Sequence, residues 1–453
     1  MKIYMPLTRP LLLIALFSIQ TVSAGPIADS HDPQMNIHTP TKSPFRIPGS
    51  KDLVYIPYIF STDSTGLAGG AGIIKQGLIQ PQTITIATLF YGAEQHVRSD
   101  KEDRVNFSGG FLGIFDYRVS GTERLLASVA GLKSYFPKAR YYIYDHGNDS
   151  DKKSYVESAG DMDFLYGTLK YVLPLGDGLD NPEGDYTLRH GFAIGRENYG
   201  GGVPFVTGRT SLGISGFYEH YSFDNYLPQT SRSTDGIKSW NTNGLRFFME
   251  HDNTDFDLNP SRGYQFKLQY SKDFGWADSD RSWDFLEFKY NHYIDLPAFS
   301  FTQQNVLAVS LWTGYSFSWD KNSRLPGDID AHRPPPWEGA RLGGMFRMRG
   351  YNTDRFSDKA VVYGTAEYRA ILEWNPFRKS EYIPVAVDWL QVVGFAEAGR
   401  VNDTYDLDLL SDLKYDIGLS LRAMAATVPI RLDVAYSEEG VNFWVMVFQP
   451  FDF

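Results

Sequence analysis

Residues 413–436, which read LKYDIGLSLRAMAATVPIRLDVAY, decide the fold of this chain. Apolar residues alternate with polar or small ones from Leu413 to Leu421 and again from Val428 to Tyr436. Successive side chains of a β-strand point to opposite faces, so a period of two predicts strands with one apolar and one polar face. We therefore expect two neighbouring β-strands here, separated by a short turn.

The same alternation recurs along much of the chain, for example in 264–272 and 301–317. One apolar face sustained over about ten residues is typical of a transmembrane β-barrel with a polar lumen, whereas strands of soluble sandwiches usually have about 5–6 residues. The pattern predicts an all-β protein, a 16-stranded antiparallel transmembrane β-barrel. Its strands are expected at 53–61, 67–77, 83–93, 104–117, 124–136, 160–174, 204–222, 243–252, 262–273, 283–294, 302–317, 361–373, 386–401, 413–424, 428–436 and 442–453.

Connection lengths set the orientation of this barrel. A further segment, 187–198, has a strand-like composition. It is left out because bacterial single-chain barrels have an even number of strands, short periplasmic turns and long external loops. The connection 175–203 then stays in the periplasm or the lumen, without an explained role. The charged stretches fall on the external side: 94–103, 137–159, 223–242, 274–282 and 402–412.

Composition narrows the class of protein. The chain has 453 residues, of which 42% are hydrophobic and 15% aromatic, with 42 glycines, which favours β structure. A net charge of −11 argues against nucleic-acid binding through a general basic field. The absence of cysteine excludes a disulfide framework and thiolate metal sites, and suits a chain that crosses an oxidising compartment unfolded.

The N-terminal part predicts secretion. Residues 1–24 have a basic start, an apolar run at 11–17 and the small-residue cleavage site Val22-Ser23-Ala24, as in a signal peptide. The alternative, a membrane anchor, needs a run of about 20 apolar residues. Residues 25–52 are a polar lead-in, expected in the periplasm and shorter than the usual minimum of about 50 residues for a domain. We assign 53–453 to the barrel.

The C-terminal residues 441–453 are strand-like and aromatic, and a closed barrel needs its last strand to pair with its first. The alternative is the buried last strand of a soluble β domain. Phe451 and Phe453 resemble the aromatic signal that outer-membrane proteins present to their insertion machinery. Pro57 and Pro450 each remove a backbone donor from these two strands, which predicts a weakly bonded seam unless both lie beyond the hydrogen-bonded ladder.

The longest connection between two strong strands is 318–360. A loop of this length without periodicity is usually functional or disordered. Glycines separated by apolar residues indicate a packed segment, and the place to pack within a barrel is the lumen. We therefore expect 318–360 to fold into the barrel.

Four motifs in and around this loop resemble the bacterial surface antigen family, the outer-membrane assembly barrels of the BamA/TamA-like superfamily. Met348-Arg349-Gly350-Tyr351, together with Arg347, resembles the signature loop of that family. The other motifs are Val362–Arg369, Val393–Gly399, and the turn Asp252–Asp255 with Pro260 and Gly263. The resemblance covers about 240–453 well and the N-terminal strands loosely.

The resemblance implies a barrel in the bacterial outer membrane that aids insertion or export of a protein or lipid. Its implied partners are outer-membrane lipids and lipopolysaccharide, the insertion machinery during biogenesis, and a protein or lipid substrate, with no cofactor. The chain departs from the family in leaving no room for periplasmic POTRA (polypeptide-transport-associated) domains, and in having Glu397 where Asp is usual. The alternative is a passive plugged pore or a structural barrel without assembly activity.

A lumenal loop has a consequence for Arg349. A buried guanidinium needs carboxylate partners. Glu397 and Glu367 are the candidates, because either can accept the bidentate fork of arginine. Glu367 shares one face of 361–373 with Arg369, which points it to the lumen. The alternative is that Arg349 is an exposed loop arginine.

The sequence contains no enzymatic motif that assigns catalytic residues or a metal site. The histidines have no His-Glu-x-x-His spacing and no Gly-x-Ser-x-Gly elbow occurs. The glycines of 66–72 fit a close-packed strand better than a dinucleotide loop, because no helical pattern follows. The acidic stretch 145–151 lacks the glutamate of a calcium-binding loop and is expected to be a solvated external loop.

Overall fold

The computed structural model describes residues 35–36, 53–62, 66–80, 83–96, 104–182, 184, 187–196, 199–227, 237–325, 329–378, 387–425, 428–447 and 449–451. The predicted signal peptide lies outside these residues, as do all but Met35 and Asn36 of the lead-in. Within the described part, no helix has the length and apolarity that crossing a membrane requires.

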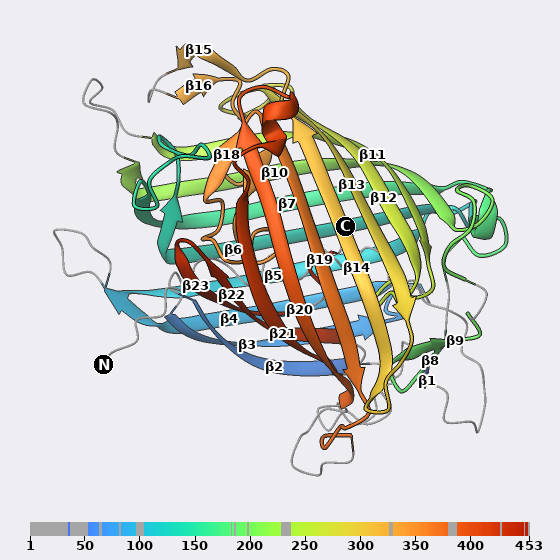
Figure 1. Ribbon diagram of the computed structural model, residues 1–453. Coiled ribbons are helices and arrows are strands. Elements are labelled where there is room, and N and C mark those ends of the chain that lie inside the picture. Colours follow the sequence, from blue (N-terminus) through green and yellow to red (C-terminus); the bar gives the residue numbers. More distant parts are fainter. Residues whose placement is uncertain are drawn as a thin grey trace, which may run out of the picture.

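One large antiparallel sheet dominates the molecule (Figure 1). Its strands follow one another in chain order: β2 (Leu53–Thr62), β3 (Gly66–Gln76), β4 (Ile84–His96), β5 (Arg104–Arg118), β6 (Leu125–Tyr141), β7 (Val156–Val172), β10 (Arg209–Leu227), β11 (Ile237–Thr254), β12 (Gly263–Asp273), β13 (Trp283–Leu296), β14 (Thr302–Tyr315), β19 (Ala360–Leu372), β20 (Val387–Asn402), β21 (Lys414–Ala425), β22 (Val428–Ser437) and β23 (Gly440–Val447).

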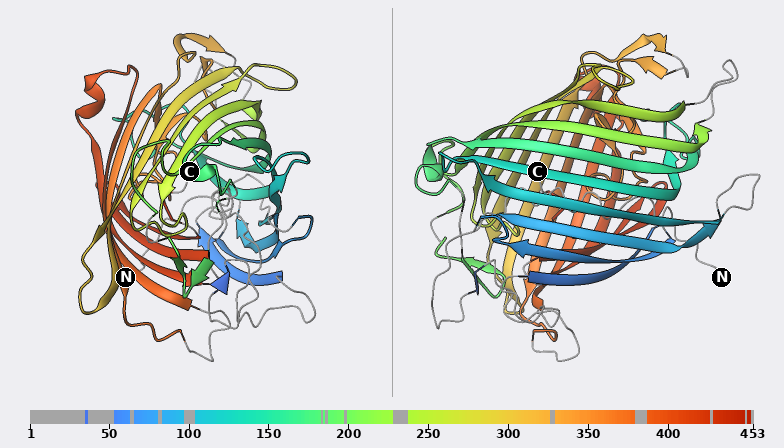
Figure 2. Two further views of the ribbon diagram at one scale, coloured as in Figure 1. Left: turned by 90° about the vertical axis from the view of Figure 1, so that its right-hand side faces the viewer. Right: turned by 180° about the vertical axis from the view of Figure 1, so that it is seen from behind.

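The all-β antiparallel prediction is confirmed, and each of these strands overlaps one of the segments expected from the sequence. Figure 2 shows the sheet curling around an interior, with β2 and β23 as its two edges. Among the described residues these two edges are not paired with each other, so closure of the barrel stays a prediction.

The connection between β7 and β10 forms a small element of its own. It contains the short helix η2 (Gly176–Gly178) and the strands β8 (Thr187–Arg189) and β9 (Phe192–Ile194), which pair with β1 (Met35–Asn36) in a separate sheet. The turn between β8 and β9 reaches β20, because the indole N–H of Trp389 donates to the carbonyl of Gly191 at 3.0 Å. Strands β8 and β9 of segment 187–198 thus lie outside the main sheet, as the even strand number predicts.

Strands β4–β7 are apolar on both faces. The outer face exposes Leu89, Tyr91, Leu112, Val129, Leu165 and Leu169, while the opposite face buries Phe90, Phe107, Phe111, Leu132, Phe136 and Phe164. Phe90 stacks on Phe107 with ring centroids 4.9 Å apart. Trp337 and Met345 of the long loop belong to the same buried cluster. The expected polar lumen is therefore wrong for this wall, because its inner side chains are buried in one apolar cluster that also includes residues of the long loop.

The long loop between β14 and β19 spans 316–359 and carries four short strands. These are β15 (Asp320–Leu325) paired with β16 (Ile329–Ala331), and β17 (Ala340–Leu342) paired with β18 (Phe356–Asp358). Leu342, Met348, Tyr351 and Phe356 are buried in one cluster with Trp283 and Trp312 of the sheet. The loop is packed against the interior of the sheet, as its glycine and apolar content predicts.

The C-terminal strand is shorter than expected. β23 ends at Val447, and residues 449–451 turn into the lumen. The carbonyl of Phe451 accepts hydrogen bonds from Asn291 at 2.7 Å and Lys289 at 3.1 Å, both on β13. Its buried ring lies 4.7 Å from the guanidinium carbon of Arg369. The predicted strand over 442–453 is wrong at its end, because the hydrogen bonds from Asn291 and Lys289 hold Phe451 against β13. Phe453 lies outside the described residues.

Candidate functional site

The tip of the long loop is a tight turn that carries the Met-Arg-Gly-Tyr motif. Met348 adopts a φ of +55°, which is uncommon for a residue with a side chain, and is fully buried. The amide of Tyr351 donates to the carbonyl of Met348 at 3.0 Å, and the amide of Gly344 donates to the carbonyl of Tyr351 at 3.2 Å. This turn presents Arg349 to the inner face of the sheet.

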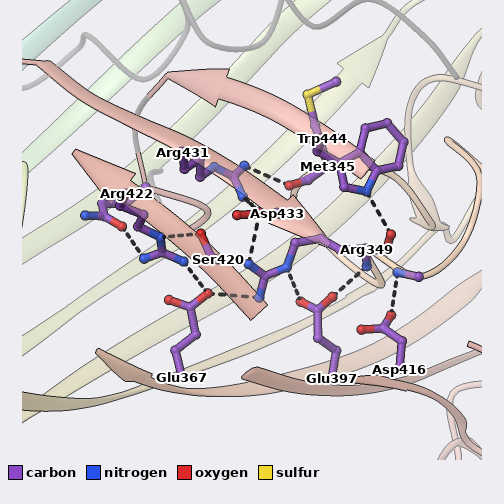
Figure 3. A network of polar contacts seen from close by, with 12 residues as sticks. Met345, Arg349, Glu367, Glu397, Asp416, Ser420, Arg422, Arg431, Asp433 and Trp444 are labelled. Atoms are coloured by element: carbon purple, nitrogen blue, oxygen red, sulfur yellow. Dashed lines mark hydrogen bonds and ion pairs between the residues drawn. The ribbon is translucent and has the colours of Figure 1, made fainter. Parts of the chain in front are cut away.

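Arg349 is surrounded by carboxylates (Figure 3). Its Nη2 lies 2.9 Å from Glu367 on β19, its Nε lies 3.2 Å from Glu397 on β20, and its Nη1 lies 3.3 Å from Asp433 on β22. Its exposed fraction is 0%. Burial alone would lower the pKa of Arg349, but these carboxylates raise it well above its ordinary value, so the guanidinium stays charged.

Backbone contacts extend this anchor to the neighbouring strands. The amide of Arg349 donates to Glu397 at 2.6 Å, and the amide of Gly350 donates to Asp416 on β21 at 3.0 Å. The indole of Trp444 on β23 donates to the carbonyl of Arg349 at 2.8 Å. The loop tip is therefore bonded to every strand from β19 to β23, which is the C-terminal edge of the sheet.

The carboxylates around Arg349 have further cationic partners. Glu367 also pairs with Arg369 and Arg422, at 2.8 Å each, and Asp433 pairs with Arg431. Arg431 in turn donates to the carbonyl of Met345 in the loop at 2.8 Å. Arg349, Glu367, Arg369, Glu397, Asp416, Arg422, Arg431 and Asp433, which we call the lumenal charge network, are all at most 2% exposed. The four arginines pair with Glu367, Glu397 and Asp433, which limits the cost of burying these charges, whereas Asp416 joins the network through the amide of Gly350.

The structure brings Arg349 together with Glu397 and Glu367, the two partners expected from the sequence. Asp433 and Asp416 were missed, although their alternation with apolar residues in 413–436 places them on the polar face. Arg347 does not join the network: its guanidinium carbon lies 3.6 Å from the ring centre of Trp312. Tyr351 donates from its hydroxyl to the carbonyl of Tyr415 at 3.2 Å.

A second anchor holds the loop to the opposite wall. Trp337 stacks on Tyr221 of β10 with ring centroids 3.6 Å apart, and its indole N–H donates to Glu219 at 2.6 Å. Glu338 pairs with Arg246 of β11 at 2.9 Å, and Arg246 also pairs with Glu219 at 3.2 Å. The loop thus bridges the lumen from β10 and β11 to the strands β19–β23.

The loop 142–155, expected on the external side, contacts the long loop around β18. The amide of Ser357 donates to the carbonyl of His146 at 2.7 Å, and the guanidinium of Arg355 donates to the hydroxyl of Ser150 at 2.7 Å. Asn148 is buried. The stretch 145–151 is therefore less solvated than predicted, because the long loop supplies partners for it. Among the described residues, no group of three or more His, Asp or Glu side chains could hold a metal ion.

Gly350 lies where the loop approaches the wall closely. A Cβ at this position would lie 2.6 Å from the Cβ of Asp416 and 2.9 Å from the Cβ of Ser437. Gly350→Ala is therefore expected to push the loop tip off the sheet and to lower the temperature at which the barrel loses its compact mobility on gels. Gly147→Ala is the matched control, because a Cβ there meets nothing within 4 Å. Equal unfolding temperatures for both variants would contradict this close approach.

Comparisons with protein families and solved structures identify proteins that this chain resembles. The model of the Omp85 superfamily domain matches residues 177–443, more than half of the chain. Among solved structures, CdiB from Escherichia coli matches with a TM-score of 0.50 at 11% identity, over 87% of this chain and 61% of that one. No curated protein matches the sequence.

Two further structures have somewhat lower scores. BamA from Haemophilus ducreyi lacking POTRA domains 1–3 has a TM-score of 0.47 at 12% identity, over 96% of this chain and 76% of that one. CdiB from Acinetobacter baumannii has a TM-score of 0.49 at 11% identity, over 87% and 58%. The chain thus spans about three fifths of the length of either CdiB. On the superfamily match, the chain belongs to the Omp85 superfamily and is a β-barrel protein of the bacterial outer membrane.

Proposed function

We propose that this chain forms a closed 16-stranded barrel that helps to insert or export a protein or lipid at the outer membrane. Its superfamily supports an assembly or translocation barrel in general terms. The observation that carries the proposal is the burial of Arg349 among carboxylates of β19, β20 and β22, beside the C-terminal edge of the sheet. Because the loop 316–359 is bonded to these strands, displacement of the loop from the lumen and opening of the seam would each affect the other.

The filled lumen argues against an open pore. A 16-stranded barrel with nothing inside leaves an aqueous channel. Here the loop 316–359 crosses the interior and is bonded on both sides, through Arg349 on one wall and through Trp337 and Glu338 on the other. Substrate that passes this barrel must either displace the loop or move along the wall.

The seam between β2 and β23 is the place where the wall is expected to open. β23 has eight residues, the fewest of the strands in this sheet, so it offers few backbone groups to a partner strand. Pro57 lies within β2, opposite Ala71 of β3, and has no N–H to donate. Pro450 follows β23 instead of lying in it, so the early end of β23 replaces the weakening role expected of Pro450.

Partners and substrate follow from this proposal. The barrel would contact outer-membrane lipids and lipopolysaccharide through its exposed apolar face, and would itself need the insertion machinery during biogenesis. A protein or lipid is its expected cargo. That cargo could be a soluble passenger, and a separate partner could carry the POTRA domains. The alternative is a passive plugged pore or a structural barrel, which the filled lumen also fits.

Deletion of the gene in its host separates the two functions. The proposed function predicts that a defined set of outer-membrane or surface components is depleted, as measured by quantitative proteomics and lipid analysis of the isolated outer membrane. Restoring the intact gene on a plasmid should recover that set, whereas the Arg349→Ala variant should recover it only in part. An unchanged outer-membrane composition, accompanied by altered uptake of small solutes, would favour the passive pore instead.

A further inference from the structure

The external loop 403–413 folds over the outside of the sheet. Its short helix η3 (Leu407–Leu410) lies at the outer edge of the sheet in the left view of Figure 2. The hydroxyl of Tyr405 lies 2.8 Å from the hydroxyl of Thr313 on β14. Thr313 points outward, because its neighbour Trp312 is buried and donates from its indole to Glu287 inside. The loop therefore crosses the outer surface of β19 to reach β14.

The outer surface of the sheet beneath the loop carries small side chains that leave room for it. The outward positions of β19 at this height are small, Ala360 and Val362, and they pair with Asn402 and Arg400 of β20. Arg400 donates to the carbonyl and the hydroxyl of Ser411 at 2.7 Å each, which ties the far end of the loop to the wall. The ring of Tyr405 packs edge-on against Tyr315 at 6.1 Å.

An apolar face results on η3. Leu407 is 82% exposed and Leu410 is 63% exposed, whereas Leu409 is buried. In a 3₁₀-helix the side chains at i and i+3 point in the same direction. Leu407 and Leu410 therefore form one outward apolar face, which together with Tyr405 we call the outer hook.

The position of the outer hook along the strands indicates that it faces lipid. One ladder step below Thr313, Val362 and Arg400 lies the row Leu311, Gly364, Ala398 and Tyr415. Leu311 and Tyr415 are 51% and 61% exposed on the face that meets lipid. A ladder step of two residues is about 7 Å. Tyr405, through which the outer hook contacts β14, thus lies about one ladder step from this lipid-facing row.

Three of the four aspartates of this loop have partners within the protein, and Asp408 is exposed on another face of η3. Asp403 pairs with Lys321 at 3.3 Å, and Asp412 pairs with Arg400 at 3.4 Å. Asp406 caps η3 by accepting from the amide of Asp408 at 3.0 Å. The leucine face is therefore free to meet an apolar phase without drawing these carboxylates into it.

We infer that the outer hook inserts Leu407 and Leu410 among the acyl chains of the outer leaflet, and so fixes the external end of β14, β19 and β20 at the membrane surface. Amphipathic surface elements bind at this depth through a small buried apolar face. This role is independent of the cargo and holds equally for a passive barrel.

Environment-sensitive labels test this insertion, because the chain has no native cysteine. Single cysteines at Leu407 and Leu410 are labelled with a nitrobenzoxadiazole fluorophore, and the protein is reconstituted into phosphatidylcholine vesicles. Asp408 is the matched control, one residue away on another face of η3, and Asp149 reports an exposed position in another external loop. These side chains are exposed, so the substitutions should leave the fold intact.

The labels at 407 and 410 should emit at shorter wavelength than those at 408 and 149, and should be quenched by lipids spin-labelled near the headgroup. Equal emission at all four positions would overturn the insertion. A blue shift that disappears when the protein is diluted at constant lipid would also overturn it, because a second copy of the chain would then be the occupant.

Discussion

Replacing Arg349 with alanine is expected to lower the free energy of unfolding of the barrel by about 3–5 kcal/mol, the usual cost of breaking a buried ion pair. The substitution leaves Glu397, Glu367 and Asp433 without the guanidinium that lies within 3.3 Å of each. Glu397 loses most, because Glu367 and Asp433 keep other arginines. The loop should then detach from β19–β23.

The measurement is unfolding by heat or urea in detergent, followed by the mobility of the folded barrel on gels. Arg347→Ala is the matched control. Arg347 lies in the same turn, but its guanidinium packs on Trp312 instead of joining the lumenal charge network. Conductance in planar bilayers gives a second readout: small and flickering for the native chain, larger for Arg349→Ala. Equal losses of stability in the two variants would refute the anchoring role.

A double-mutant cycle isolates the pair of Arg349 and Glu397. Residues in one ion-pair network usually show interaction energies of about 0.5–3 kcal/mol. Additive effects of Arg349→Ala and Glu397→Ala would therefore argue against the pairing. Exchange of the two charges is a poorer test than the sequence alone suggests, because a glutamate at 349 would face Glu367 and Asp433 as well.

The sequence located the strands because the period of two is a local property. It also located Arg349, Glu367 and Glu397, because the glycine and apolar content of 318–360 placed the loop in the lumen, the resemblance singled out Arg349, and a buried guanidinium requires carboxylates. It missed Asp433 and Asp416 as partners. Alternation tells which face a side chain lies on, but the height at which the loop tip meets the wall depends on the packing of the whole loop.

Other errors have similar physical origins. The end of β23 was set too late, because the capture of Phe451 by Asn291 and Lys289 involves residues 160 and 162 positions apart in the sequence. The apolar inner face of β4–β7 was missed, because two-sided apolar strands lose the alternation that marks a lumen. The charged composition of 402–412 hid the exposed Leu407 and Leu410.

The seam carries the central claim, that the barrel works by opening between β2 and β23. One cysteine at Val445, whose side chain is exposed on β23, is combined in turn with single cysteines along 55–61 of β2. A disulfide forms only where the Cα atoms come within about 7 Å, so the pair that oxidises also defines the closure of the barrel. Val445 lies away from the contact of Trp444 with Arg349, so the plug stays in place.

A matched control carries a disulfide between strands that are not expected to part. Leu419 and Val434 oppose each other on β21 and β22, where antiparallel Cα atoms are about 4.5–5.5 Å apart. Both cross-links constrain the wall to a similar extent. Only the cross-link between β2 and β23 holds the seam shut.

The deciding measurement is therefore complementation of the deletion strain by the seam-locked barrel under oxidising and then reducing conditions, with the Leu419–Val434 cross-link alongside. Opening of the seam predicts that oxidation abolishes recovery of the missing outer-membrane components, that a reductant restores it, and that the control works under both conditions. Full recovery with the oxidised seam would contradict lateral opening and leave the passive plugged pore as the function of this barrel.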